Sequence, residues 1–438
     1  MESQSNFSLN WSGNVKANPK ILSPKTLEEL KKIVDEKNFI ISGNQRSFGD
    51  NSVNPNLIVS MKNFNNVVDF NKRDGIIEVQ SGALLKNILS LILHEGWCIP
   101  VTPGTKYVSI GGMIANNTHG KNILNNQIKH HVLEIKILTP KKEIINCSKN
   151  ENKNFFEMTI GGFGLTGCIL SVKIKLKKIT SFFVEQEVKE FKSYDEFFSL
   201  LKKSDSYEYN VNWIDNFDSK KIRGLCYFGK HATENNGIPK EKISFKEKKI
   251  SLLNFLFLKI FTQNYYLIKI TKFTFRKLKK IFYKKISSFD NFFYPQDYFV
   301  NWNKIYGRNG FFQVQFLVKE KDFINVLNRI SSFFTKEKNF STFIIIKKFN
   351  ERGKYLNFYG EGFSISMDIP INSKFSKTKD FLNNLFKEFK TRINLSKDSI
   401  CNKHVIEQND GYMQFKKELE LINPDKKLNS LFSNRLKI

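Results

Sequence analysis

Three glycine-containing loops near the N-terminus constrain the fold of this chain more than any other feature. They span residues 43–50, 104–120 and 161–167, and they follow or link short apolar segments typical of buried strands. Glycine lets a backbone approach a ligand closely, and successive N–H groups in such loops bind phosphate oxygens. None of the three is the nucleotide fingerprint G-x-G-x-x-G directly after a strand, and none is a Walker loop. The residues alone therefore leave two interpretations open, ordinary turns or a site for a large phosphate-bearing cofactor.

Strand and helix signals alternate through this N-terminal region. Thr26 and Glu29 have the spacing of a capping box ahead of an apolar helix face. Residues 39–42, 57–61 and 75–82 are predicted strands, and 84–96 is a predicted helix that ends at Gly96. HVLEIKILTP and KEIINCS predict a hairpin pair, and CILSVKIKLKKI predicts a further strand. The texture changes after about residue 180, so we place a domain boundary near 178–182.

Composition excludes several classes of protein. The chain has 438 residues, 40% of them apolar, which excludes wholesale disorder and allows a sizeable core. It contains no run of eighteen uncharged apolar residues, and its N-terminus lacks the pattern of a secretory signal. Five scattered cysteines without a C-x-x-C argue against a disulfide framework and against a zinc site, so no metal is expected and a reducing cytosol is the default.

The net charge of +28 favours anionic partners such as phosphates, nucleic acid or an anionic membrane face. An AT-rich genome would also enrich lysine, so the excess has a second explanation. Residues 239–286 contribute fourteen Lys/Arg and two Glu, interleaved with apolar and aromatic clusters. This stretch is either a solvated face over a core or an element that lies on a membrane surface. No nucleic-acid-binding module is visible, so nucleic acid is not an expected partner.

The three loop motifs together resemble a known family. ISGNQRSFGDN, VTPGTKYVSIGGMIANNTHGKN and TIGGFGLTGCIL, in that order, resemble the FAD-binding domain of the vanillyl-alcohol oxidase/PCMH superfamily. WID, GKHA, WNKIYG, GFFQVQF, MDIP and the C-terminal tail resemble the subfamily of decaprenylphosphoryl-ribose 2-oxidases. The resemblance implies a two-domain α+β fold. Residues 1–180 would form a PCMH-type FAD-binding domain, 181–398 a mixed-sheet substrate domain, and 399–438 a segment that returns to the FAD domain.

The resemblance also implies which residues hold FAD. The pyrophosphate would lie against the first two loops, the end of the second loop would run toward the isoalloxazine, and the third would hold the adenosine end. Covalent relatives usually carry a histidine where this chain has Arg46, so the resemblance implies noncovalent FAD, with Arg46 near a phosphate. The expected cofactor-binding residues are Gly43, Asn44, Gln45, Arg46, Ser47, Phe48, Gly49, Asp50, Asn51, Gly104, Ser109, Ile110, Gly111, Gly112, Asn116, Asn117, Thr118, His119 and Ile169.

Candidate residues for the substrate follow from the second half of the chain. Gln313 and Gln315 alternate on a predicted strand, so both face one side, either toward sugar hydroxyls or toward solvent. By resemblance, Lys403 in SICNKHV lies on a C-terminal strand and is catalytic, and His119 is the second catalytic residue, a polar and proton-handling contact near the flavin ring. The other expected substrate contacts are Trp213 and Tyr306. Ser366 stands where close relatives can carry a cysteine.

These features favour an FAD-dependent oxidoreductase that acts on CH–OH groups. The expected reaction is oxidation of the C-2 hydroxyl of a polyprenyl-phosphoryl pentose to a keto sugar, the first half of a 2-epimerisation in cell-envelope glycan synthesis. A short-chain reductase would be the partner, and the enzyme would be cytoplasmic or peripheral at the inner face of the plasma membrane. Two alternatives remain: a soluble sugar-alcohol or aldonolactone oxidase of the same superfamily, and a nonenzymatic basic protein that binds membrane or nucleic acid.

Overall fold

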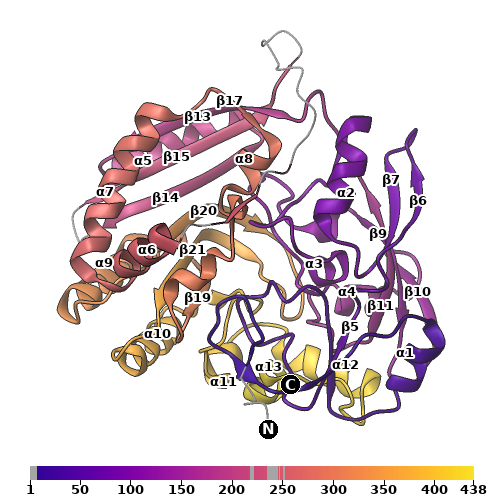
Figure 1. The fold of residues 1–438 in the computed structure, drawn as a ribbon. Coiled ribbons are helices and arrows are strands. Elements are labelled where there is room, and N and C mark those ends of the chain that lie inside the picture. Colours follow the sequence, from indigo (N-terminus) through magenta and orange to yellow (C-terminus); the bar gives the residue numbers. More distant parts are fainter. Residues whose placement is uncertain (1–6, 218–220, 234–244, 246, 250–251) are drawn as a thin grey trace.

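The computed structural model describes residues 7–217, 221–233, 245, 247–249 and 252–438. Part of the basic stretch, residues 239–244, 246 and 250–251, lies outside the described residues. The fold is α+β, and Figure 1 shows two halves, with the N-terminal strands on one side and a long antiparallel sheet on the other. Among the described residues, none of the helices combines the length and the apolar character that crossing a bilayer requires.

The chain begins with a small parallel sheet that positions the first glycine loop. Its order is β3-β5-β4, with β3 at Lys20–Leu22, β5 at Leu57–Ser60 and β4 at Phe39–Ser42. Helix α1 (Leu27–Ile33) connects β3 to β4. Thr26 caps α1 by accepting from the Glu29 N–H, as its spacing predicts, whereas the Glu29 carboxylate accepts from the Lys25 N–H.

A second sheet carries the other two glycine loops. Its order is β10-β9-β11-β7-β6, with bounds Ile144–Ser148, Val132–Leu138, Cys168–Lys175, Ile76–Gln80 and Val67–Asn71. The predicted hairpin of β9 and β10 is confirmed, since Ile145 pairs with Ile137. Helices α2 (Leu85–Ile92), α3 (Ile110–Ala115) and α4 (Lys153–Thr159) pack beside this sheet. Gly96 follows the α2 region at φ 77°, a left-handed conformation that glycine adopts without strain.

The second half of the chain forms one eight-stranded antiparallel sheet. Its strands, in sheet order, are β17 (Ile286–Ser288), β13 (Phe183–Phe191), β15 (Ile222–His231), β14 (Tyr209–Phe217), β20 (Phe343–Glu351), β21 (Gly360–Pro370), β19 (Phe311–Val318) and β22 (Arg392–Ile393). The strands predicted around residues 311–318, 341–349 and 363–371 are confirmed as β19, β20 and β21, and the predicted helix is α10 (Phe375–Glu388).

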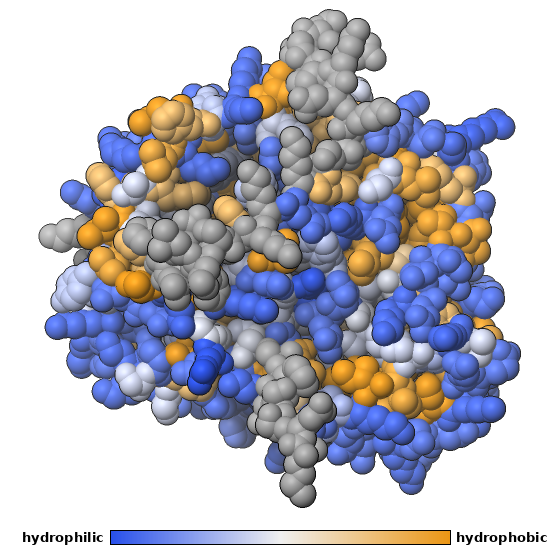
Figure 2. All heavy atoms as spheres, viewed as in Figure 1, coloured by the Kyte–Doolittle hydropathy of each residue, from blue (hydrophilic) through white to orange (hydrophobic). Residues whose placement is uncertain are grey.

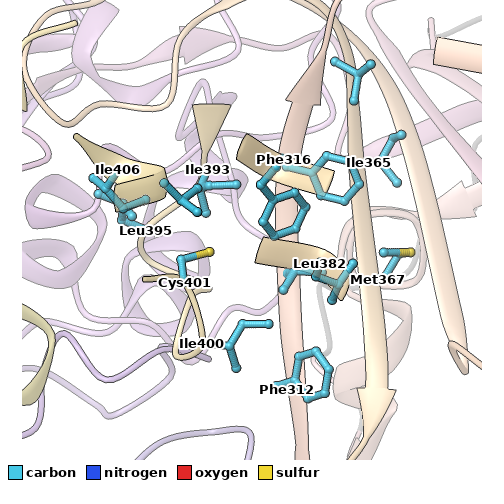
Figure 3. Packing of buried hydrophobic residues seen from close by; sticks show 14 of the residues in the cluster. Phe312, Phe316, Ile365, Met367, Leu382, Ile393, Leu395, Ile400, Cys401 and Ile406 are labelled. Atoms are coloured by element: carbon cyan, nitrogen blue, oxygen red, sulfur yellow. The ribbon is translucent and has the colours of Figure 1, made fainter. Parts of the chain in front are cut away.

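One face of this sheet is apolar and packs on helices α5 (Tyr194–Lys202), α9 (Phe323–Lys336) and α10. Phe316 of β19 contacts Phe386 of α10, with ring centroids 4.8 Å apart. Figure 3 shows this core, where Phe312, Phe316 and Met367 lie close to Leu382. Because strand side chains alternate, the residues between these apolar positions point to the opposite face of the sheet.

The opposite face carries the polar residues Gln313, Gln315, Ser364, Ser366 and Asp368. The N-terminal half of the molecule contacts this face, since His119 bonds Gln315. Helices α6 (Leu252–Gln263) and α7 (Tyr265–Phe282) lie against the same face nearer the other edge, because Phe275 of α7 packs on Trp213 of β14. The polar face is therefore enclosed on two sides.

The last forty residues lie along the N-terminal half. They form α11 (Lys403–Ile406), α12 (Tyr412–Ile422) and α13 (Leu431–Leu436). Leu428 forms a bridge with Phe39 of β4, and Arg435 of α13 binds Asp50 through two hydrogen bonds of 2.8 and 3.0 Å. The expectation of a strand at SICNKHV is wrong, because Cys401 and Asn402 are irregular and α11 begins at Lys403.

The remaining elements are short. They are β1 (Phe7–Ser8) paired with β2 (Lys16–Ala17), β8 (Trp97–Cys98) paired with β12 (Lys177–Lys178), β16 (Lys248–Lys249) paired with β18 (Phe299–Val300), and helix α8 (Phe289–Phe293). Among the single-turn 3-10 segments, Trp302–Tyr306 precedes β19.

Candidate active site

The first glycine loop lies directly against the second. A Cβ atom added to Gly43 would lie 1.9 Å from Ser109 Oγ, so only glycine allows this approach. Asn44 donates from Nδ2 to the Tyr107 carbonyl at 2.7 Å, and Asn51 donates to Asn116 Oδ1 at 2.7 Å. Two loops some sixty residues apart in sequence are thus held together by amide side chains.

Arg46 stacks on an aromatic ring and keeps an unused donor. Its guanidinium carbon lies 4.1 Å from the centroid of the Trp11 ring. Burial lowers the pKa of Arg46, and among the described residues its Nε has no hydrogen-bond partner. Ser42 Oγ and Ser81 Oγ, at the ends of strands beside the same loops, are also buried without a partner. Unpaired buried donors of this kind suit the phosphate and ribose oxygens of a dinucleotide.

The second loop contains one glycine that the protein itself does not require. A Cβ on Gly111 would lie 2.7 Å from Ser81 Cβ, and the Gly111 N–H bonds the Ser81 carbonyl at 2.7 Å. A Cβ on Gly104 would meet no protein atom within 4 Å, and its φ does not lie in the left-handed region. Ser109 caps helix α3 by accepting from the Gly112 N–H. No contact within the protein requires a glycine at position 104, so close approach of a bound group is the better reason for it.

The third loop packs on helix α3. The Gly161 N–H bonds the Ile114 carbonyl at 3.0 Å, and the Phe163 N–H bonds the Ala115 carbonyl at 2.8 Å. Asn117, at φ 39°, donates from Nδ2 to Asn357 Oδ1 at 2.9 Å and so ties this region to the antiparallel sheet. The structure therefore brings all three glycine loops to one helix.

Several predicted cofactor residues make structural contacts instead. Asp50 pairs with Arg435, Ser47 donates to the Ser396 carbonyl at 2.7 Å, and Phe48 packs edge-on against Phe311. Asn117 is buried among other amides, and Ile169 is a buried residue of β11. Roles for these five toward FAD stay predictions, and their present contacts explain how the first loop is fixed.

Gln315 stands at the centre of a buried polar network. Its Oε1 accepts from Asn394 Nδ2 at 2.8 Å and lies 2.9 Å from His119 Nε2, while its Nε2 donates to Ser364 Oγ at 2.6 Å. Gln313 donates to Asp368 Oδ1, and its own Oε1 has no partner among the described residues. Both glutamines are buried, so the alternative of a solvent-facing strand is wrong.

Three half-buried lysines surround this network, and no pattern in the sequence singles them out. Burial, followed by repulsion from Lys397 and Lys121, lowers the pKa of Lys347 far below its ordinary value. Burial lowers the pKa of Lys397 to about 8 and that of Lys121 to about 7. Lys347 donates to the Gly120 carbonyl at 2.7 Å, next to His119. We call Lys121, Lys347 and Lys397 the lysine cluster.

One carboxylate and one imidazole complete the surroundings of the cluster. Burial raises the pKa of Asp368 to about 6, against attraction from Lys397. Burial, with repulsion from Lys347 and Lys397, holds the pKa of His119 well below its ordinary value, so its imidazole is neutral near pH 7. Burial lowers the pKa of all three lysines while a single carboxylate faces them, so an anion bound beside them would restore their charged forms.

The contacts of Lys403 do not include the Gln315 network or the lysine cluster. It is the first residue of α11, its side chain is partly exposed, and its Nζ lies 2.7 Å from Glu407 Oε1. Glu407 raises the pKa of Lys403, and neither its hydrogen bonds nor its ion pair involves the network of Gln315. Lys397, six residues earlier, is the lysine of this segment that lies beside the network, since it affects the pKa of both Asp368 and His119.

The other predicted substrate residues are packed. Trp213 is buried beside Val188 and Leu225 and under Phe275 of α7. Tyr306 stacks on Phe311 at 4.1 Å, and its hydroxyl lies 2.5 Å from Thr342 Oγ1. Ser366 is buried and lies directly opposite Gln315 on the neighbouring strand. Of these, Ser366 alone borders the polar network directly.

The fold and loops define a flavoprotein. Residues 19–148 match the family model described as an FAD binding domain, so this part of the chain is a PCMH-type FAD-binding domain and FAD is the cofactor. The chain is an FAD-dependent oxidoreductase that acts on CH–OH groups. The alternative of a nonenzymatic basic protein is thereby set aside.

Curated relatives refine this class. The chain is 25% identical over 384 residues to decaprenylphosphoryl-beta-D-ribose oxidase from Mycolicibacterium smegmatis, covering 83% of this chain and 81% of the relative. It is 23% identical to L-gulonolactone oxidase from Scyliorhinus torazame and 22% identical to D-arabinono-1,4-lactone oxidase from Candida glabrata. Those two matches span only 39% and 38% of the relatives' lengths, and 38% and 45% of this chain.

Proposed function

We propose that this enzyme oxidises the C-2 hydroxyl of a polyprenyl-phosphoryl pentose to a keto sugar. The lysine cluster carries the proposal, because a phosphorylated sugar bound at the face where the FAD-binding domain meets the sheet would pair with these lysines and restore their charged forms. The similarity to decaprenylphosphoryl-beta-D-ribose oxidase, which extends through the second half of the chain, supports the same substrate class.

The reaction removes a hydride from the carbinol carbon and a proton from its oxygen. FAD, when bound, supplies the hydride acceptor. We assign the amides of Gln313 and Gln315 to the sugar hydroxyls, since both lie on the polar face of β19. Lys397 is our candidate to receive the hydroxyl proton, because its pKa of about 8 leaves part of the population neutral near pH 7. His119, neutral and bonded to Gln315, holds that amide in place.

We propose that noncovalent FAD lies in the first two loops, with Arg46 Nε toward a phosphate oxygen. An arginine cannot form the bond that a histidine forms in covalent flavoproteins, and Arg46 is instead stacked on Trp11. The keto product would be reduced by a separate short-chain reductase, which completes a 2-epimerisation for cell-envelope glycan. The proposed location is the cytoplasm, at the inner face of the plasma membrane.

Anaerobic flavin reduction tests the proposal. The purified enzyme is mixed with a polyprenyl-phosphoryl ribose, and bleaching of the oxidised flavin is followed together with formation of the keto sugar. We expect bleaching with this substrate and little with lipid-free ribose phosphate. Bleaching by ribose phosphate at the same rate would show that the lipid is not recognised.

The second candidate is an aldonolactone or sugar-alcohol oxidase. The matches to L-gulonolactone oxidase and D-arabinono-1,4-lactone oxidase favour it, although they cover less than half of this chain. The same anaerobic assay with both lactones discriminates the two, because a lactone oxidase would be bleached by the free lactone and would not require a phosphate.

A further inference from the structure

Helix α7 (Tyr265–Phe282) points two of its charged residues inward. Lys272 and Arg276 are buried, although both are cationic. Arg276 donates from Nε to Asp215 Oδ2 at 2.6 Å and contacts Glu190, and Lys272 donates from Nζ to the Ser341 carbonyl at 2.7 Å. An ordinary surface helix of a globular protein buries its apolar stripe and leaves such charges in water.

The outward side of α7 is correspondingly apolar. Ile270, Ile281 and Phe282 are 58%, 68% and 73% exposed, and Tyr266 and Phe273 are exposed as well. At about 100° per residue, positions 266, 270, 273 and 281 fall within an arc of roughly 80°. Figure 2 shows apolar side chains gathered on the side of the molecule where Figure 1 places α7. The exposed Lys277 falls within the same arc, so this apolar stripe is interspersed with a lysine. Exposed apolar side chains gathered on one helix face in this way mark an interaction surface.

The charge around this stripe has one sign. From Leu252 to Ile286 the sequence contains no Asp or Glu. The exposed lysines of this region are Lys269, Lys277, Lys279, Lys284 and Lys285. An apolar helix face bordered by lysines is the pattern of an element that lies in the interface of an anionic bilayer, where basic side chains reach the head groups. It does not fit a second copy of α7, because two such faces would repel one another.

We infer that α7 docks flat on an anionic phospholipid surface through Tyr266, Ile270, Phe273 and Ile281. This surface lies on the same side of the sheet as the polar network. Phe275 packs on Trp213, Trp213 is paired with Ile345, Ile345 with Ser366, and Ser366 with Gln315. Three steps between neighbouring strands correspond to about 14 Å. Where the inference concerns delivery of a lipid-linked sugar, it rests on the proposed function; binding of α7 to lipid does not.

Vesicle co-sedimentation of the full chain with FAD, without substrate, tests the inference. The variant Ile270→Ser/Phe273→Ser/Ile281→Ser removes the apolar stripe and leaves Lys272 and Arg276 in place. We expect wild-type protein to bind phosphatidylglycerol vesicles, with weaker binding at high salt and little binding to phosphatidylcholine. The triple variant should bind about a hundredfold more weakly, since each lost anchor removes buried apolar area, and its melting temperature should not fall.

The matched control is Leu124→Ser/Met413→Ser/Leu421→Ser, three comparably exposed apolar residues outside α7. It should bind vesicles as the wild type does. The inference is overturned if the wild type ignores anionic vesicles at low salt, or if both triple variants bind equally. It is also overturned if the wild type is a dimer by light scattering and the α7 variant a monomer, because the stripe would then be a protein interface. Since no substrate is present, none of these outcomes bears on the reaction.

Discussion

At the scale of single residues, the position of a lysine decides its chemistry. Lys397 and Lys403 are six residues apart, yet burial of its surroundings lowers the pKa of Lys397 whereas the pair with Glu407 raises the pKa of Lys403. Burial without a close carboxylate shifts a lysine toward its neutral form. An exposed ion pair between residues i and i+4 contributes little to the stability of the fold. The first environment suits a group that acts on substrate, and the second is typical of a helix surface.

Replacement of each lysine by methionine separates these roles. Lys397→Met should slow anaerobic flavin reduction by about a hundredfold or more, the usual effect of removing a positioned charged group. FAD content and melting temperature should be retained, because the substitution removes a desolvated amine and does not leave an unpaired charge behind. Lys403→Met should reduce its flavin within about twofold of the wild-type rate. If wild type and Lys397→Met reduce their flavin at equal rates, Lys397 does not accept the hydroxyl proton and another residue must have that role.

Asp368 predicts a pH-dependent stability. Burial raises its pKa from 3.8 to about 6 in the folded protein. The folded state therefore binds its proton more tightly than the unfolded state, so the stabilisation is present below about pH 4 and is lost as pH rises through about pH 6. Two pKa units correspond to about 3 kcal/mol.

The variant Asp368→Asn keeps an acceptor for Gln313 but does not titrate. Between about pH 4 and about pH 7 we expect the free energy of unfolding of the wild type to fall by about 3 kcal/mol relative to this variant. Denaturant unfolding with FAD present, repeated across this range, measures the difference. A difference that stays constant with pH would mean that Asp368 is ionised throughout.

At the scale of elements, two glycines of the loops should behave differently when a methyl group is added. Gly104→Ala meets no protein atom within 4 Å, so the melting temperature of the FAD-free protein should not change. Its affinity for FAD should fall by at least tenfold, because the added Cβ occupies space that we assign to the cofactor.

Gly43→Ala is the contrasting variant. Its Cβ would lie 1.9 Å from Ser109 Oγ, which caps helix α3. Displacing that cap costs about 1 kcal/mol, so here the FAD-free protein should itself melt earlier. Titration with FAD and thermal melts of both variants provide the comparison. If Gly104→Ala binds FAD as tightly as the wild type, Gly104 does not face the cofactor.

The sequence predicted those features of the elements that depend on local patterns. The alternation in β19 placed Gln313 and Gln315 on one face, and the register with β21 agrees. The same alternation places Lys347 on that face, because Lys347 pairs with Ser364 of β21. The sequence did not distinguish this lysine from the many other Lys and Arg residues. The sequence does not show whether that face meets solvent or the FAD-binding domain, because this depends on contacts between distant parts of the chain, which hydrophobic periodicity does not reveal.

The strand expected at SICNKHV failed for a related reason. Its only support was resemblance, whereas residues 403–406 follow an Asn cap and form a helical turn. Likewise, the apolar and basic clusters of residues 239–286 left a solvated face and a membrane-surface element open and did not show how α7 is oriented. That orientation is set by Asp215 and Glu190, which lie on separate strands and bind Arg276. The sequence does not show such partners before the sheet is known.

At the scale of the whole molecule, the FAD-binding loops join segments from every part of the chain. Trp11 from the N-terminus stacks on Arg46, the Ser396 carbonyl near the C-terminus accepts from Ser47, and the sheet reaches the second loop through His119. Ligand binding to a site of this kind stabilises the entire fold, since unfolding anywhere in it releases the ligand.

Noncovalent FAD therefore predicts a stability that depends on added flavin. Free FAD at about a hundred times its Kd should raise the free energy of unfolding by about 2.7 kcal/mol. Acid precipitation should leave all the yellow colour in the supernatant. Arg46→Ala should bind FAD more weakly, by about tenfold or more, since it removes a charge-assisted hydrogen bond to phosphate. Flavin that sediments with the precipitated polypeptide, or a melting temperature indifferent to added FAD, would show a covalent link and remove Arg46 from the role proposed for it.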